Sequence, residues 1–262
     1  MTLEVMWWLG WLYFAAWATL PLALAGVVGP ILGVMAWVML APWSALLGMA
    51  LAHRLLPVAE EGTFRMFADR GSVRWALKGW APTVYLTVFQ PVFFLSPLFQ
   101  RISLRAFGAR VGAGAQVTTR TSIREPHLVD LGRDSMVGEH AHLACSLQPR
   151  PRTLVVGRIV IGDGALIGAY CVLGAGCRVG ARSVVEYGVS IGAHSTIGED
   201  TRIGAHTFVR DRVRIGRRVR IGKECSIAFG AVVPDGARLA DGTRWPAPPV
   251  LSEAGCVPQC LQ

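Results

Sequence analysis

The feature that most constrains this chain is an aliphatic residue at every sixth position through its C-terminal half. The positions are Ile161, Ile167, Leu173, Val179, Val185, Ile191, Ile197, Ile203, Val209, Ile215, Ile221, Ile227, Val233 and Leu239. A six-residue period does not stay on one face of an α-helix, which turns once in about 3.6 residues, but it does stay on one face of a strand. The run is therefore an internal repeat of extended segments.

Two further positions of each repeat support this interpretation. Most of the aliphatic residues are followed by glycine, which permits a backbone turn. Four positions after each aliphatic residue stands a small or β-branched residue, and Cys171, Cys177 and Cys225 are among these. We expect the aliphatic side chains to stack inward from coil to coil and the small residues to pack inside the corners. The three cysteines are then core residues rather than nucleophiles.

The pattern [Leu/Ile/Val]-Gly-x-x-[small]-x resembles that of the hexapeptide-repeat superfamily. The resemblance implies a left-handed parallel β-helix with triangular coils of three hexads each. Residues 131–242 then form about six coils, and an earlier set of aliphatic residues, offset by two, adds one coil at 111–128. The expected fold class is therefore an all-β left-handed parallel β-helix of about six to seven coils at residues 111–245, followed by a tail at 246–262.

The N-terminal part of the chain has a different composition. The chain is 52% hydrophobic with a mean hydropathy of +0.43 although its net charge is +9, and Val5–Val28 and Ile31–Ala52 contain no charged residue. Each stretch is long enough to cross about 30 Å of hydrocarbon as a helix, and Gly29-Pro30 separates them. A cleaved signal peptide is the alternative, but the N-terminus lacks a positive region. Residues 1–56 are predicted to form an α-helical transmembrane hairpin.

Residues 57–110 are predicted to be a basic connector followed by a membrane-interfacial segment. The uncharged stretch Ala81–Gln100 is interrupted by Pro91 and Pro97, and basic residues flank it on both sides. A third transmembrane helix is possible, but positive flanks favour the cytoplasmic side for both ends. We therefore expect a re-entrant or interfacial helical segment, and a protein of the cell inner membrane with its β-helix on the cytoplasmic side.

Longer motifs give a narrower resemblance. GTFRMFADRGSVRWALKGW, SLRAFGARVGAGAQVTTRTSIREPHLVDLG and the terminal GTRWPAP look like the membrane-embedded domain that terminates poly-lysine-synthetase-type nonribosomal peptide synthetases, and are similar to sugar and capsule acetyltransferases. The resemblance implies a homotrimeric acyltransferase that binds membrane lipids, has no bound cofactor and uses a CoA thioester as co-substrate. Its acceptor is expected to be an amphipathic, lipid-linked or small molecule with a hydroxyl or amine. The alternative is a non-catalytic scaffold that trimerises or anchors a biosynthetic complex.

Most enzymes of the superfamily resemble one another in using a histidine as the general base that removes the acceptor proton. In many members this histidine lies in a loop that interrupts the coil. The corresponding loop here is Leu147–Val156, which contains no histidine. Ser146 and Gln148 stand about where the related chains carry theirs, so both are candidate site residues.

The nearest histidines are His140 and His142, in the hexad before the loop, with Glu139 beside them. Their hexad phase points them outward, so either one, oriented by the carboxylate, is a candidate base. A surface histidine without a role is the alternative. His194 has the same hexad position as His140, which predicts the same face three coils away if the loop adds no net offset to the frame.

Two other kinds of site are less favoured by the sequence. A zinc site is not expected. The resemblance to hexapeptide carbonic anhydrases would imply two zinc-binding histidines five residues apart, and this sequence has no such pair. His194 and His206, twelve residues apart, should lie on different faces. Cys145 is expected to point outward beside the loop, as an inert or reactive thiol.

Seven basic residues lie between Arg210 and Lys223. A solvated face is one interpretation of such a run. Phosphate recognition is the sharper one, because arginine makes forked contacts with phosphate oxygens. Arg217, Arg218, Arg220 and Lys223 are therefore predicted to bind the phosphates of CoA. Nucleic acid is not an expected partner for a prism attached to a membrane.

Overall fold

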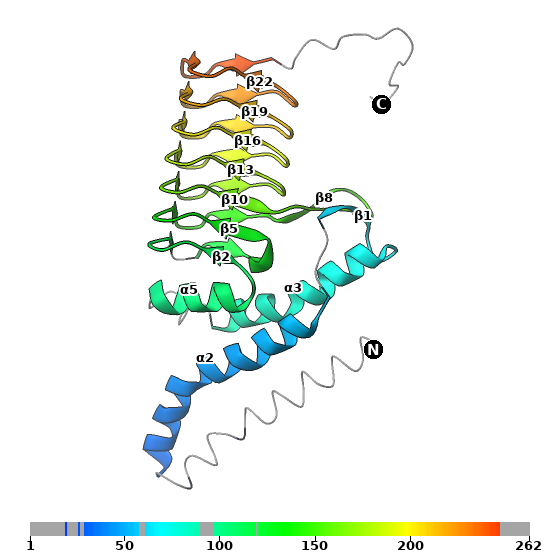
Figure 1. The fold of residues 1–262 in the computed structure, drawn as a ribbon, viewed down its shortest axis with the longest axis vertical. Helices are drawn as coiled ribbons and strands as arrows, with labels where there is room; N and C mark the ends of the chain where they lie inside the picture. The colour runs from blue at the N-terminus through cyan, green and yellow to red at the C-terminus, as the bar shows by residue number, and fades with distance from the viewer. Residues whose placement is uncertain are drawn as a thin grey trace.

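The computed structural model describes residues 29–57, 61–89, 97–118 and 120–246, together with Thr19 and Gly26. Within these residues, helices form a base and the coils of a prism rise above it in sequence order (Figure 1). The first apolar stretch of the expected hairpin and nearly all of the tail at 246–262 lie outside the described residues.

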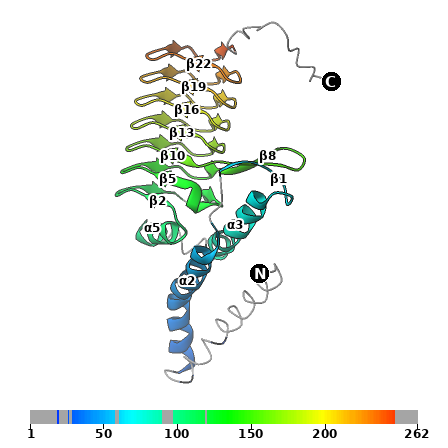
Figure 2. The same ribbon diagram turned by 45° about the vertical axis from the view of Figure 1, so that its right-hand side comes forward.

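The prism is a parallel β-solenoid of left-handed type, and each of its three faces holds seven short strands. The β2 face contains β2 (Arg110–Val111), β5 (Val129–Leu131), β10 (Ile159–Ile161), β13 (Arg178–Val179), β16 (Thr196–Ile197), β19 (Arg214–Ile215) and β22 (Val232–Val233). The β3 face contains β3 (Gln116–Val117), β6 (Met136–Val137), β11 (Leu166–Ile167), β14 (Val184–Val185), β17 (Arg202–Ile203), β20 (Arg220–Ile221) and β23 (Arg238–Leu239). The β4 face contains β4 (Ser122–Ile123), β7 (His142–Leu143), β12 (Val172–Leu173), β15 (Ser190–Ile191), β18 (Phe208–Val209), β21 (Ser226–Ile227) and β24 (Arg244–Trp245). One strand per face in each coil makes seven coils, which confirms the predicted solenoid (Figure 2).

The repeat explains why the coils stack. Each aliphatic residue of the sixfold series is buried and lies beside its equivalent one coil on, as Ile161 does beside Val179. The cysteines at the small position, Cys171, Cys177 and Cys225, are buried in the same core, as predicted. A side chain at Gly198 would collide with the backbone of Gly216 in the next coil, so the glycine that follows the aliphatic residue allows the coils to approach closely.

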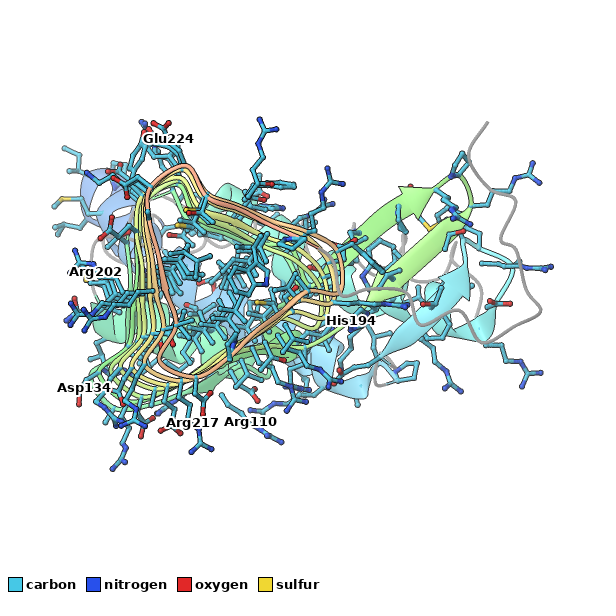
Figure 3. All side chains as sticks on the ribbon, turned by 90° about the horizontal axis from the view of Figure 1, so that it is seen from above. Arg110, Asp134, His194, Arg202, Arg217 and Glu224 are labelled. Carbon is cyan, nitrogen blue, oxygen red and sulfur yellow. The ribbon has the colours of Figure 1, made fainter. Side chains whose placement is uncertain are left out.

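Seen along its axis, the prism is a triangle with three corners (Figure 3). Asp134 and Arg217 lie at the corner between the β2 and β3 faces, called here the β2–β3 corner. Glu224 marks the β3–β4 corner, and His194 marks the β4–β2 corner.

Two insertions disturb the lower coils. Val111 and Leu131 are stacked neighbours twenty residues apart rather than eighteen, because the short 3₁₀ helix η1 (Pro126–Leu128) is inserted at the β4–β2 corner. This insertion explains the offset of the first aliphatic set. Leu131 and Ile161 are stacked neighbours thirty residues apart, so two hexads are inserted in the second coil.

The second insertion was expected to be an irregular loop, and it is instead a β-hairpin. Its strands are β8 (Ser146–Arg150) and β9 (Thr153–Val156), and β1 (Gly62–Arg65) pairs with β9 as a third, antiparallel strand. The hairpin projects from the β4–β2 corner of the prism (Figure 3). The pairing of β9 with β1, a strand from the base, stabilises the extended conformation of the hairpin, and the sequence of the hairpin alone does not predict this partner.

The base consists of α2 (Pro30–Leu55), α3 (Arg70–Val88) and α5 (Pro97–Ala106). α2 begins after Gly29, whose φ of 87° is positive, and Pro30 occupies its first turn, so the predicted break at Gly29-Pro30 is confirmed. α5 lies under the first coil, where the Gln100 side chain donates to the carbonyl of Val117 at 2.5 Å and accepts from its amide at 3.2 Å. These contacts close the lower edge of the β3 face.

Residues 57–110 were expected to be a basic connector followed by a membrane-interfacial segment, and this division stays a prediction. α3 continues without a break through Ala81 and Pro82, so the expected connector and the expected segment share one helix there. The predicted break at Pro91 lies outside the described residues. Among the described residues, no helix combines the length and the apolar character needed to cross a membrane. The transmembrane hairpin at 1–56 therefore stays a prediction.

Candidate functional site

The point where the hairpin leaves the second coil brings polar residues from three segments together. The buried carboxyl of Glu125 accepts a hydrogen bond from the Ser146 hydroxyl at 2.7 Å and another from the Trp75 indole nitrogen at 3.2 Å. Ser146 begins β8, Trp75 lies on α3, and Glu125 precedes η1. These contacts link a predicted site residue to both the base and the first coil.

Glu125 is a carboxyl in an unusual environment. Burial raises its pKa above the ordinary value, while the hydrogen bond from Ser146, the charge of Arg124 and the hydrogen bond from Trp75 oppose that rise. Sequence analysis missed this residue, because it falls at η1, where the repeat is interrupted and the hexad frame assigns no direction to a side chain. The pair Arg124-Glu125 directly before Pro126 was the only signal available.

His142 lies on β7 of the β4 face, four residues before Ser146. Its strand neighbours are Ser122 in the coil below and Val172 in the coil above. The ring is half-buried, and its pKa is lowered by burial and by the charge of Arg124. Arg124 therefore acts on both His142 and Glu125. A histidine with a lowered pKa is neutral at pH 7 and retains a nitrogen that can accept a proton.

His140 and Glu139 occupy a different place. His140 lies at the β3–β4 corner with a positive φ of 56°, and its ring stacks on Tyr170 at 4.8 Å between centroids. Glu139 is 3.8 Å from the His140 ring nitrogen. Both histidines lie outside the aliphatic core, as their hexad phase predicts, but His140 belongs to a corner stack and His142 to a strand. The carboxylate is placed beside His140.

Gln148 lies further out on β8, and its exposed amide contacts only the sulfur of Met66, at 3.7 Å, among the described residues. It does not join the cluster formed by Ser146 and Glu125. Cys145 was expected to point outward, and this expectation is wrong. The thiol is fully buried, 3.6 Å from the carbonyl of Leu128, and burial together with the charge of Glu125 holds its pKa well above the ordinary value.

His194 does not share a face with His140. It lies at the β4–β2 corner. The insertion that forms the hairpin adds two hexads between the two histidines, so every later hexad lies on a different face from the one that an uninterrupted repeat would give it. His206 lies at the β3–β4 corner, so the prediction that His194 and His206 lie apart is confirmed. In the described part of the chain, no group of three or more His, Cys, Asp or Glu side chains is placed to hold a metal ion.

The basic residues between Arg210 and Lys223 are distributed around the prism rather than gathered on one face. The four that were predicted to bind CoA belong to its sixth coil. Arg217 and Arg218 lie at the β2–β3 corner, Arg220 on the β3 face, and Lys223 at the β3–β4 corner. These four border a single face, whereas Arg210, Arg212 and Arg214 belong to the other side of the coil.

Two stretches of the prism match models of known repeats. Residues 158–193 match the bacterial transferase hexapeptide (six repeats), and residues 212–243 match the hexapeptide repeat of succinyl-transferase. Both stretches lie in the regular coils, so the repeat that builds this prism is of the transferase hexapeptide type. No curated protein sequence gives a significant match to the chain.

Solved acyltransferase structures resemble the solenoid at low sequence identity. AntD, an N-acyltransferase from Bacillus cereus in complex with dTDP and 3-hydroxybutyryl-CoA, is 17% identical with a TM-score of 0.44, over 52% of this chain and 80% of AntD. LpxA from Acinetobacter baumannii is 13% identical with a TM-score of 0.43, over 52% of this chain and 54% of LpxA. The acetyltransferase domain of PglB from Neisseria gonorrhoeae, in complex with acetyl coenzyme A, is 20% identical with a TM-score of 0.37, over 60% of this chain and 74% of that domain. The matched region spans only about half of LpxA.

Proposed function

We propose that this protein is an acyltransferase that moves an acyl group from a CoA thioester to a hydroxyl or amine. The observation that carries the proposal is the combination of transferase-type hexads with a polar cluster where a hairpin interrupts them. A solenoid without a task in catalysis has no need for a buried carboxyl and a neutral histidine beside that interruption.

His142 is the proposed general base. The acceptor oxygen or nitrogen attacks the thioester carbonyl while His142 takes its proton, and the CoA thiolate leaves and is protonated. The lowered pKa of His142 keeps it in the unprotonated form that this step requires. The Ser146 hydroxyl donates a hydrogen bond to the Glu125 carboxyl. We assign both as positioning residues where the hairpin begins, rather than as acid or base groups.

The donor and acceptor are parts of the same proposal. Arg217, Arg218, Arg220 and Lys223 bind the phosphates of CoA, and the acceptor is amphipathic or close to a membrane, as the narrower resemblance implies. The active form is a homotrimer in which the active site lies between neighbouring prisms. Attachment to the inner membrane by residues 1–56, with the prism in the cytoplasm, completes this proposal.

A non-catalytic scaffold is the second candidate function. The observation that favours it is the absence of histidine from the hairpin, Ser146–Val156. CoA binding separates the two candidates, because CoA at 100 times its dissociation constant should stabilise the folded enzyme by about 2.7 kcal/mol. A scaffold should melt at the same temperature with and without CoA.

The decisive experiment measures release of the CoA thiol from acetyl-CoA in the presence of hydroxyl and amine acceptors. Replacement His142→Ala should lower turnover about 10²–10⁴-fold, since that is the usual contribution of a general base. His140→Ala tests the other predicted base, and His194→Ala is the matched control at another corner. Full activity in His142→Ala would exclude the role proposed for that residue, and absence of thiol release with every acceptor would favour the scaffold.

A further inference from the structure

A cavity of about 320 Å³ lies between residues of the helical base and residues of the first coils. It is lined by the end of α2, by α3, by the end of α5 and the segment after it, by η1 and by the residue that precedes β10. Its ionisable lining residues are His53, Arg54, Lys78, Arg105, His127 and Arg158. None of them was predicted as a site residue, because they come from segments far apart in the sequence.

Two histidines are buried in the wall of this cavity without hydrogen-bond partners. His53 is 2% exposed and His127 is 8% exposed, and their ring centroids are 5.4 Å apart. Nε2 of His53 and both ring nitrogens of His127 have no partner among the described residues. Buried polar groups in folded proteins are nearly always paired, so each orphan nitrogen needs a ligand or ordered water. Gly108, with a φ of 90°, leaves room here, since a Cβ on it would lie 3.2 Å from the Cβ of His127 and 3.8 Å from the ring of His53.

The charged lining is entirely basic. Lys78 donates to the carbonyls of His53 at 2.6 Å and Leu56 at 3.1 Å, which leaves the third of its three N–H groups for a ligand. Arg158 is paired with Asp130 at 2.9 Å and with Glu61 at 3.3 Å. No carboxylate lines the cavity.

The two remaining cations are Arg54 and Arg105, at the exposed mouth of the cavity. Neither has a carboxylate partner within ion-pair distance among the described residues. Arg105 uses part of its guanidinium to donate to the carbonyl of Val111, which holds the side chain in place. Together with Lys78 they give three cations that line one space and have no carboxylate partner among the described residues.

We infer that this cavity binds the phosphate group of a phosphorylated ligand. Three uncompensated cations match a group with about two negative charges better than a singly charged carboxylate, and guanidinium forks match its oxygens. Neutral imidazole rings add N–H donors in the wall. The site is separate from the proposed CoA contacts in the sixth coil, and it does not depend on transfer chemistry.

The same phosphate chemistry has two sources, a soluble phosphate compound or a lipid headgroup. The lipid source has a physical argument, because α2 leads directly to the cavity and exposes apolar side chains, including Leu47, Leu51 and Leu55. A phosphorylated lipid could place its chains along α2 and its headgroup in the cavity. Both sources are therefore tested.

The test uses the full chain and two probes, inorganic pyrophosphate in solution and nanodiscs that contain phosphatidic acid. The variant Arg54→Gln/Arg105→Gln removes two exposed charges from the cavity mouth and leaves the buried core intact. Its matched control is Arg150→Gln/Arg152→Gln, which removes two exposed charges from the hairpin tip. Binding is measured by calorimetry for pyrophosphate and by co-sedimentation for nanodiscs. A second variant, His127→Leu, removes donors from the wall.

The cavity variant should lose affinity by about tenfold or more, since each charge-assisted hydrogen bond contributes about 1.5–3 kcal/mol. Binding of pyrophosphate with this dependence supports a soluble ligand. Binding to phosphatidic-acid nanodiscs alone, with the same dependence, supports a lipid headgroup. Equal affinity in the cavity variant and its control, or no binding of either probe, would overturn the inference. Loss of turnover in His142→Ala has no bearing on any of these outcomes.

Discussion

The lower and upper coils of the prism are built from one repeat but bury different chemistry. The four upper coils, from Arg178 to Trp245, bury only the hydroxyl side chains of Ser183, Ser195, Thr201 and Thr207 among polar residues of the described structure. Each hydroxyl donates to a backbone carbonyl of the next coil, as Thr201 does to Gly216 at 2.9 Å. The lower coils and the base bury ionisable groups: His53, Lys78, Glu125 and His127.

The difference follows from the insertions. A regular coil supplies a backbone partner for every buried polar group, so it is self-sufficient and has no need of a ligand. The 3₁₀ helix η1 and the hairpin interrupt this pattern, and the base helices pack against the irregular surface that results. Ionisable side chains are then buried at the positions where the repeat is interrupted. The candidate base, the buried carboxyl and the cavity all lie in this lower region.

The largest effect is expected from a charge inside the regular coils. Ile197 is 2% exposed, so Ile197→Asp would bury an unpaired carboxylate and should lower the free energy of unfolding by about 4 kcal/mol or more. Glu199→Ala, at the exposed β2–β3 corner only two residues away, should change it by less than about 0.5 kcal/mol. Thermal unfolding followed by circular dichroism measures both. Equal melting temperatures would contradict the assigned direction of the side chains.

Such a prediction is possible because the coil fold is local in sequence. The hexad frame identifies Ile197 as inward and Glu199 as outward, and it correctly places Cys171, Cys177 and Cys225 in the core. The direction of each side chain depends only on residues within one coil and on the coil above. For this part of the fold, the period alone was sufficient.

The lower region could not be predicted in the same way. β1 pairs with β9 about ninety residues later, and His53 meets His127 from another segment, so no spacing in the sequence announces either contact. Cys145 was misplaced for the same reason, because the frame assumed a continuing coil where the hairpin begins. The resemblance to hexapeptide enzymes drew attention to the hairpin but not to Glu125, which lies in the coil beneath it.

Acid should destabilise the lower region selectively, because the buried histidines His53 and His127 both belong to it. Burial, with the charges of His53, Lys78 and Arg158, lowers the pKa of His127 to about 3. In the unfolded chain this histidine has a pKa of about 6.5, so on acidification the unfolded state binds a proton before the folded state does. The free energy of unfolding therefore falls as the pH decreases from about 6.5 to about 3. Above about pH 6.5, His127 causes no change in stability. The slope is at most about 1.4 kcal/mol per pH unit.

Urea unfolding at pH 7 and pH 5 tests this dependence. His127→Gln should lose less stability between the two pH values than the parent protein does, while His206→Gln, at an exposed corner, should behave like the parent. The comparison between variants is necessary because the raised pKa of Glu125 acts in the opposite direction. An identical loss in His127→Gln and the parent would show that His127 does not remain neutral in the fold.

A smaller effect is expected where the base closes the lower edge of the prism. Gln100→Ala would leave the buried amide and carbonyl of Val117 without partners and should lower the free energy of unfolding by about 1–3 kcal/mol. Gln116→Ala, on the exposed side of β3, is the matched control and should be nearly silent. Denaturant titration followed by tryptophan fluorescence gives both values. If the two variants are equally stable, α5 does not cap the prism.

The smallest effect concerns CoA and separates the sixth coil from the base. Arg217, Arg218 and Arg220 border the β3 face five coil spacings above the first coil, roughly 24 Å at about 4.8 Å per coil. Attraction to an anionic leaflet beside the base decays within about 8 Å, so these arginines contribute little to membrane attachment. The amide of Arg217 already donates to Asp235 at 2.8 Å, which fixes the backbone of this corner and leaves the guanidinium for phosphate.

Changing all three arginines to serine should therefore weaken CoA binding by about tenfold, equivalent to about 1.4 kcal/mol, and leave attachment to anionic liposomes unchanged. The control changes Arg120, Arg150 and Arg152, which are exposed near the base, to serine and should leave CoA affinity unchanged. Calorimetry with CoA and liposome co-sedimentation measure the two effects. Unchanged CoA affinity with lost liposome attachment in the sixth-coil variant would mean that the prism lies along the membrane. The upper coils would then be a lipid-binding surface, and the division of tasks between the two regions would be reversed.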